Sequence, residues 1–217
     1  MKQLSIKISD TLGSVSAALI TPPGMKALIV LAHGAGAGMN HIFMVQLSEA
    51  LAGKGIGTLR YNFPYMENGK KRPDVPAVAM KTTEMVLATA HQRFPKARIF
   101  GAGKSFGGRM TSQYLSKHQP EYVSGLLFYG FPLHAAGDPG VDRAEHLKTV
   151  PVPMLFMQGS RDALAELKLI KQVTKKLKNV TLEVFEGADH SFKSGKKVFI
   201  AELAEASHNW IDSIGSI

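Results

Sequence analysis

The chain has 217 residues and a formal net charge of +9, and 45% of its residues are hydrophobic while 20% are charged. This length suits a single domain spanning residues 1–217. The composition is typical of a folded globular protein and excludes a wholly disordered chain. The absence of cysteine excludes disulfide bonds, thiolate metal sites and a cysteine nucleophile.

No stretch of the sequence approaches the run of about 18 uninterrupted apolar residues that a membrane-spanning helix needs. The first ten residues, MKQLSIKISD, contain two lysines but no apolar core of the length found in signal peptides. We therefore expect a cytoplasmic protein without a membrane partner, either as a monomer or as a homodimer.

The excess positive charge is concentrated in three separate segments, at residues 70–72, 171–178 and 193–197. None of them interleaves its lysines with the aromatic residues on which single-strand binders stack bases. We expect these lysines to lie on solvated helix faces and loops, and we do not expect nucleic acid as a partner. A basic surface can still favour acidic substrates through its long-range field.

Apolar segments typical of strands alternate with segments of helical periodicity along the chain. The expected strands lie at about residues 4–8, 15–21, 27–34, 56–63, 97–103, 123–130, 152–159 and 180–187. The first two read as a pair at a sheet edge. The third is nearly all apolar, as expected for a strand that is buried on both faces.

Helical periodicity indicates helices at about residues 43–53, 77–94, 105–117, 167–177 and 199–210. The segments 64–76 and 131–150 read as irregular connections. This alternation predicts an α/β fold with a mostly parallel central sheet of about eight strands and helices on both faces. Segment 131–150 is too short for a large cap domain, so we expect an open, shallow site.

The segment RIFGAGKSFGGRM, residues 98–110, matches parts of two motifs. A phosphate-binding loop needs a glycine five positions before the glycine of Gly-Lys-Ser, and Arg98 occupies that position. A dinucleotide-binding G-x-G-x-x-G that starts at Gly101 would have Phe106 in place of its third glycine. Both nucleotide-binding interpretations therefore fail on spacing.

The remaining interpretation of this segment is a G-x-S-x-G motif, Gly103 to Gly107, between a strand and a helix. That context is required for a nucleophile elbow, in which a strained turn exposes the serine and glycines let strand and helix approach closely. The motif alone is weak evidence, because glycine-rich turns between strands and helices are common. The interpretation of Ser105 as a nucleophile therefore depends on whether a base and a carboxylate follow it in the sequence.

A serine becomes a nucleophile only when a base takes its proton, and a carboxylate must orient that base. Downstream of Ser105, Asp162 lies in the turn after a strand, and His190 lies in the loop after the next strand. The alternative role for Asp162 is a helix N-cap. Asp189, next to His190, is expected to cap its loop, because neighbouring side chains diverge.

With these residues in place, the chain resembles a small α/β-hydrolase of the dienelactone-hydrolase-like branch, similar to compact hydrolases of unassigned substrate. The matching segments, in family order, are LAHGAGAG, GAGKSFGG, MQGSRD and EGADHSF, and they cover nearly the whole chain. Dienelactone hydrolases themselves use a cysteine nucleophile, which this chain lacks, so their particular substrate does not transfer.

The resemblance implies Ser105 as nucleophile, His190 as base and then acid, and Asp162 as the carboxylate that orients it. It also implies an oxyanion hole formed by the N–H of Phe106 and an N–H from the loop after the third strand. We expect Ala35 to supply the second N–H, with Gly36 as the alternative.

Several further residues have a functional and a structural interpretation. A pocket for the substrate could be lined by Gly36, Phe63, Tyr65, Tyr129 and Phe131, which lie near the carboxyl ends of strands, where α/β sheets bind ligands. Packing in the core accounts equally well for the four aromatic residues. We expect His33 to hold its loop by hydrogen bonding. Lys104 could lie near the site or form a salt bridge at the surface, and we expect the surface position. No histidine pair has the spacing of metal ligands, so we expect no metal site.

The resemblance implies a serine hydrolase that cleaves a small carboxylic ester, thioester or lactone through an acyl-enzyme intermediate and without a cofactor. The alternative is a non-catalytic interaction module on the same fold, because a fold does not by itself imply activity.

Overall fold

The computed structural model describes residues 1–214 and contains an eight-stranded sheet with the order β1-β2-β4-β3-β5-β6-β7-β8. Strand β2 runs antiparallel to β1 and β4, and the strands β3, β5, β6, β7 and β8 run parallel to β4. The predicted, mostly parallel sheet is thereby confirmed. Its strands are β1 (Lys2–Ser9), β2 (Gly13–Ile20), β3 (Ala27–Ala32), β4 (Ile56–Tyr61), β5 (Arg98–Lys104), β6 (Val123–Tyr129), β7 (Met154–Gly159) and β8 (Val180–Phe185).

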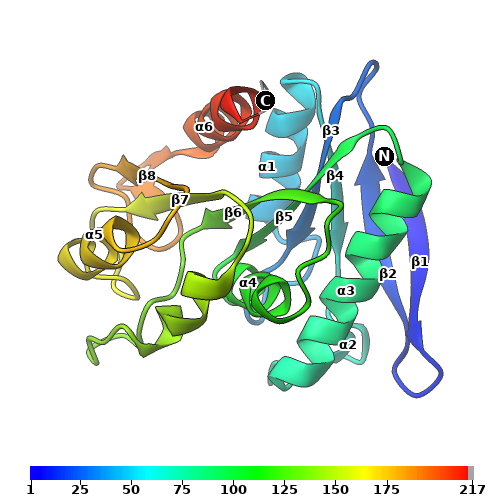
Figure 1. Cartoon of the computed structure of the whole chain (residues 1–217), viewed down its shortest axis with the longest axis horizontal. Helices are drawn as coiled ribbons and strands as arrows, with labels where there is room; N and C mark the ends of the chain where they lie inside the picture. The colour runs from blue at the N-terminus through cyan, green and yellow to red at the C-terminus, as the bar shows by residue number, and fades with distance from the viewer. Residues whose placement is uncertain (215–217) are drawn as a thin grey trace.

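Helices cover both faces of this sheet, as predicted (Figure 1). One face carries α1 and α6, and the other carries α3, α4 and α5. The helices are α1 (Ile42–Gly53), α2 (Pro64–Glu67), α3 (Pro76–Arg93), α4 (Phe106–His118), α5 (Leu167–Lys175) and α6 (Ile200–Ser213). In the described part of the chain no cap domain covers the sheet, because the connection between β6 and β7 contains a single short 3-10 helix, η1 (Asp142–Thr149).

Strand β3 shows why the sheet is built from continuous apolar segments. Leu28 and Val30 pack into the core layer under α3 and α4, whereas Ile29 and Leu31 pack into the layer under α1 and α6. All six residues of β3 are buried. Since successive side chains of a strand point to opposite faces, a strand covered on both faces must be apolar at every position.

Three short elements were not predicted from the sequence: the 3-10 helix η1, helix α2, and a hairpin of β9 (Lys193–Ser194) with β10 (Lys197–Val198). Helix α2 is one turn that starts at Pro64, where a proline suits the first helical position. Elements this short contain too few residues to show a periodicity, so their sequences cannot be distinguished from those of loops.

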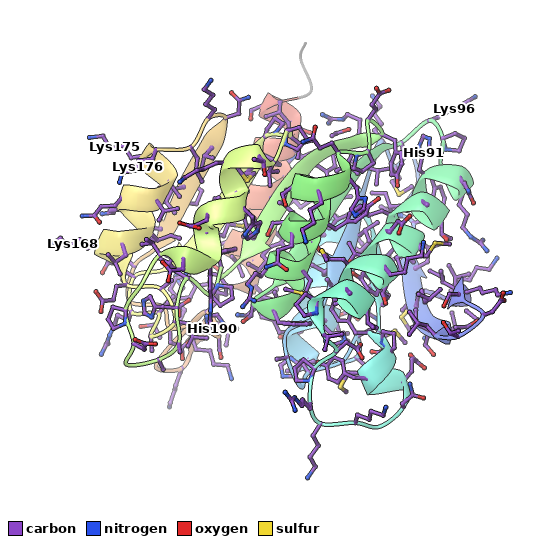
Figure 2. The ribbon with its side chains drawn as sticks, turned by 60° about the horizontal axis from the view of Figure 1, so that its bottom comes forward. His91, Lys96, Lys168, Lys175, Lys176 and His190 are labelled. Atoms are coloured by element: carbon purple, nitrogen blue, oxygen red, sulfur yellow. The ribbon has the colours of Figure 1, made fainter. Side chains whose placement is uncertain are left out.

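Lys168 and Lys175 of α5 and Lys176, the residue that follows the helix, lie on its outer side (Figure 2). These side chains are exposed, and so are the basic residues of segments 70–72 and 193–197. The expectation of solvated basic faces and loops is therefore confirmed. Within residues 1–214, no helix is long and apolar enough to cross a membrane.

Candidate active site

Ser105 lies in the sharp turn between β5 and α4, at the carboxyl edge of the sheet. Its backbone angles, φ +51° and ψ −117°, are strained for a residue with a β-carbon. Glycines make the turn possible. A β-carbon on Gly103 would lie 2.2 Å from the nitrogen of Gly108, and one on Gly107 would lie 2.5 Å from the carbonyl oxygen of Ala32. The sequence around Ser105 therefore folds into the tight strand–turn–helix that the motif predicts.

A chain of two hydrogen bonds joins the three predicted residues. The Nε2 atom of His190 lies 2.9 Å from Oγ of Ser105, and Nδ1 of His190 lies 2.7 Å from Oδ2 of Asp162. Because an ionised carboxylate only accepts hydrogen bonds, Nδ1 carries the hydrogen and Nε2 has a free lone pair. This tautomer allows His190 to accept the proton of the serine hydroxyl.

Asp162 holds His190 and is not a helix N-cap, because the N-cap residue of α5 is Glu166. The Oδ1 atom of Asp162 accepts a hydrogen bond of 2.8 Å from the backbone N–H of Leu164, which caps the turn after β7, while Oδ2 holds His190. Oδ2 also accepts a hydrogen bond from the side-chain amide of Gln158. The carboxylate side chain is fully buried, and a buried carboxylate must have such donors. Gln158 was not singled out from the sequence.

The loop that carries His190 is held close to the end of β7. A β-carbon on Gly159 would lie 2.3 Å from the carbonyl oxygen of Ala188, so this approach requires glycine. Asp189 caps the loop, as predicted, because its carboxylate accepts hydrogen bonds from the backbone N–H groups of Ser191 and Lys193 at 2.8 and 2.9 Å.

His33 holds the loop after β3 in place, as predicted. Its Nδ1–H donates to the carbonyl oxygen of Gly34 at 2.7 Å, and its Nε2 accepts a hydrogen bond from the backbone N–H of Phe63 at 3.1 Å. The second bond requires the neutral imidazole, because a protonated Nε2 cannot accept a hydrogen bond. Burial lowers the pKa of His33 from 6.5 to about 4, because desolvation disfavours the charged form.

The loop after β3 passes directly beside the serine. A β-carbon on Gly34 would lie 3.7 Å from the β-carbon of Ser105. In this loop the N–H of Gly36 donates to the hydroxyl oxygen of Tyr65 at 2.9 Å. Within residues 1–214, the N–H of Ala35 has no hydrogen-bond partner. Phe106 is the first residue of α4, and N–H groups of a first helical turn lack partners within the helix.

The aromatic residues predicted as a possible pocket lining are instead part of the core. Phe63, Tyr65, Tyr129 and Phe131 are all buried, with exposures of 1% or less. Tyr129 donates to or accepts from the hydroxyl of Ser207 at 2.9 Å, which turns it towards α6. The four aromatic side chains complete the packing on both faces of the sheet. They are core residues, and the interpretation of them as a pocket lining is corrected. Only Gly36, of the five proposed lining residues, is exposed.

The expectation of a surface position for Lys104 is wrong. Its ammonium group donates a hydrogen bond of 2.7 Å to the carbonyl oxygen of His190. The ammonium group lies beside the stacked rings of Phe43 and Phe192. Lys104 is therefore half-buried and belongs to the candidate site. Within residues 1–214, no three or more histidine, aspartate or glutamate side chains are arranged to hold a metal ion.

The fold and this hydrogen-bonded chain are those of an α/β-hydrolase without a cap domain. The family model described as the alpha/beta hydrolase domain matches residues 25–213, and the chain belongs to that family.

Solved structures of other proteins share the fold at low sequence identity. An alpha-beta serine hydrolase homologue from Coxiella burnetii is 21% identical, with a TM-score of 0.75 over 98% of this chain and 96% of the other. A dienelactone hydrolase from Anabaena variabilis is 18% identical, with a TM-score of 0.75 over 98% and 97%. An esterase domain from Rhodothermus marinus is 14% identical, with a TM-score of 0.75 over 99% of both chains.

Proposed function

We propose that the protein is a serine hydrolase that cleaves a small carboxylic ester, thioester or lactone through an acyl-enzyme intermediate. The observation that carries this proposal is the continuous chain of hydrogen bonds from Ser105 through His190 to Asp162. Structural neighbours that are named a serine hydrolase homologue and an esterase domain support the same class of reaction.

In the first half of the proposed reaction, Oγ of Ser105 attacks the carbonyl carbon and Nε2 of His190 takes the hydroxyl proton. His190 then passes this proton to the leaving alcohol or thiol, and the acyl group stays on Ser105. In the second half, His190 takes a proton from water, and the resulting attack releases the acid and restores the serine. General base catalysis of this kind contributes about 10²–10⁴-fold.

The negative charge that develops on the substrate oxygen needs hydrogen-bond donors near Ser105. The N–H groups of Phe106 and Ala35 are the candidates, because the N–H of Gly36 is already bonded to Tyr65. One donor of this kind contributes about 10²–10³-fold. The position of Phe106 at the N-terminus of α4 adds a favourable electrostatic field.

The proposed substrate is small because neither a cap domain nor an aromatic pocket encloses Ser105. The aromatic side chains near the carboxyl ends of the strands are buried in the core. The connection between β6 and β7 is too short to enclose Ser105. Binding energy must therefore come from a limited area of the protein next to the ester bond. This favours short acyl groups over long chains.

The test is steady-state hydrolysis of p-nitrophenyl acetate, butyrate and octanoate by the wild type and by Ser105→Ala. The proposal predicts an initial burst or steady turnover that is highest for the short esters and absent in Ser105→Ala. Equal rates in both proteins would contradict it. Inactivity of the folded wild type on all three esters and on the matching thioesters would favour the non-catalytic interaction module.

A further inference from the structure

Lys104 connects two parts of the candidate site that are distant in sequence. It is the last residue of β5 and directly precedes Ser105. Its stem lies against the loop after β3, since a β-carbon on Gly34 would be 3.6 Å from Cγ of Lys104. Its ammonium nitrogen lies 2.7 Å from the carbonyl oxygen of His190. One side chain thus spans the distance from the candidate oxyanion loop to the loop of the candidate base.

The ammonium group has both aromatic and charged neighbours, the charged ones being the carboxylates of Asp162 and Asp189. It lies 5.9 Å from the ring centre of Phe43 and 5.6 Å from that of Phe192. A β-carbon on Gly130 would be only 3.2 Å from the nitrogen. Within residues 1–214, the ammonium makes one hydrogen bond, to His190, and no ion pair.

A cation in such a place is expensive for the folded protein. An ammonium group loses its hydration on burial, and one hydrogen bond with two aromatic faces replaces only part of it. Apolar side chains of similar volume often replace buried charges without loss of stability. A methionine beside the stacked rings of Phe43 and Phe192 would keep the apolar contacts of the lysine stem. The hydrogen bond to the carbonyl oxygen of His190 is therefore the contact that a lysine supplies here and an apolar side chain does not.

We propose that Lys104 is a positioning residue for the proposed hydrolysis, whose ammonium group holds the main chain of His190 so that the imidazole is aimed at Ser105. The inference rests on the proposed function. Hydrogen bonds from charged donors are stronger than those from neutral donors. A single ammonium group can therefore hold the carbonyl group of His190 in place. The other end of His190, its Nδ1, is fixed by Asp162, so backbone and side chain are both held.

This role has a consequence for the pH dependence of activity. Burial lowers the pKa of Lys104 from 10.5 to about 8, and the charges of Asp162 and Asp189 oppose this shift. The other groups that face the ammonium are His190 and the uncharged Phe43, Phe192 and Gly130. The charged form predominates below about pH 8. Activity should therefore fall as the pH rises through about 8, because the neutral amine holds the carbonyl less strongly.

The first experiment compares Lys104→Met with the wild type and with Lys168→Met, an exposed lysine on α5 (Figure 2). We expect Lys104→Met to lower kcat/KM for p-nitrophenyl acetate about 10- to 100-fold, as misplacement of a reacting group does. Its melting temperature should be equal to or higher than that of the wild type, and its activity should lack the decline near pH 8. Lys168→Met should match the wild type in all three measurements.

The absence of cysteine from the chain allows a chemical rescue. Lys104→Cys, alkylated with 2-bromoethylamine in the unfolded state and refolded, regains a side chain with the length and charge of lysine. We expect alkylation to restore activity at position 104 and to change nothing in Lys168→Cys treated in the same way.

Wild-type kinetics in Lys104→Met, or a loss of activity that only follows a lower melting temperature, would overturn the positioning role. So would a failure of alkylation to restore activity in a folded Lys104→Cys protein. Those results leave the proposed function intact, because wild type and Lys168→Met would still hydrolyse the ester. A wild type that neither hydrolyses esters nor reacts at Ser105 would instead overturn the proposed function.

Discussion

The side-chain amide of Gln158 donates a hydrogen bond to Oδ2 of Asp162, the same oxygen that holds Nδ1 of His190. The carbonyl oxygen of this amide accepts the backbone N–H of Phe131 at 3.0 Å. Gln158 is fully buried. It therefore connects the end of β7 both to the connection after β6 and to the candidate carboxylate.

Replacement of Gln158 by leucine should reduce both activity and stability. It leaves the N–H of Phe131 without its acceptor and lets Asp162 rotate, so we expect kcat to fall about 10-fold and the free energy of unfolding to fall by about 1–3 kcal/mol. Ester hydrolysis and urea denaturation measure the two effects. A variant that is destabilised but retains wild-type kcat would show that Gln158 only supports the fold.

Replacement of Ser105 by glycine should stabilise the protein while removing its activity. Glycine adopts φ +51° without strain, so we expect the free energy of unfolding to rise by about 1 kcal/mol, and kcat/KM to fall by at least about 10⁴-fold. Ser105→Ala, which keeps the β-carbon and hence the strain, is the matched control for stability. Equal stability of the two variants would show that the turn is not strained.

Replacement of Gly159 by alanine should displace the loop of His190. The added β-carbon would lie 2.3 Å from the carbonyl oxygen of Ala188 and 2.7 Å from that of Asp189. We expect a loss of about 100-fold in kcat/KM and of about 1–3 kcal/mol in stability. Gly53→Ala is the control, because an added β-carbon there has no atom within 4 Å. Similar behaviour of both variants would refute the close approach of the loop.

Titration of His33 should make the protein less stable in acid. The pKa of His33 is about 4 in the folded protein, below its ordinary value of 6.5. Between these two pH values the folded state therefore binds fewer protons than the unfolded state. The contribution of the neutral His33 to the free energy of unfolding is fully present above pH 6.5 and is lost as the pH falls to 4. This corresponds to about 3 kcal/mol.

Unfolding by urea between pH 7 and pH 4 measures this loss in the wild type and in His33→Asn. The wild type should lose more stability than the variant, which has no imidazole to titrate. His146, whose pKa is also lowered to about 4, is present in both proteins and its contribution cancels. Parallel stability curves would contradict the assignment of the effect to His33.

The candidate residues Ser105, Asp162 and His190 were predictable because each follows a strand of a parallel sheet. Carboxyl ends of parallel strands lie at one edge, so the order of these residues along the chain already implies that they meet. The apolar sequence of β3 predicted its burial in the same way, since both faces of a central strand are covered.

The position of Lys104 could not be predicted from the sequence. Whether a lysine is solvated depends on what packs around it, and here the packing comes from Phe43 on α1 and Phe192 in the loop after β8. Local sequence contains no information about such distant partners. The same reason applies to Tyr129 and Phe131, since an aromatic residue at a strand end faces a pocket or the core depending on the elements above it.

The reactivity of Ser105 can be measured by treating the folded protein with a fluorophosphonate and analysing its peptides by mass spectrometry. We expect one phosphonyl group on Ser105 in the wild type, much slower labelling of His190→Ala, and no labelling of Ser105→Ala. An unmodified Ser105 in folded wild-type protein, under conditions that label a known serine hydrolase completely, would contradict the proposed function.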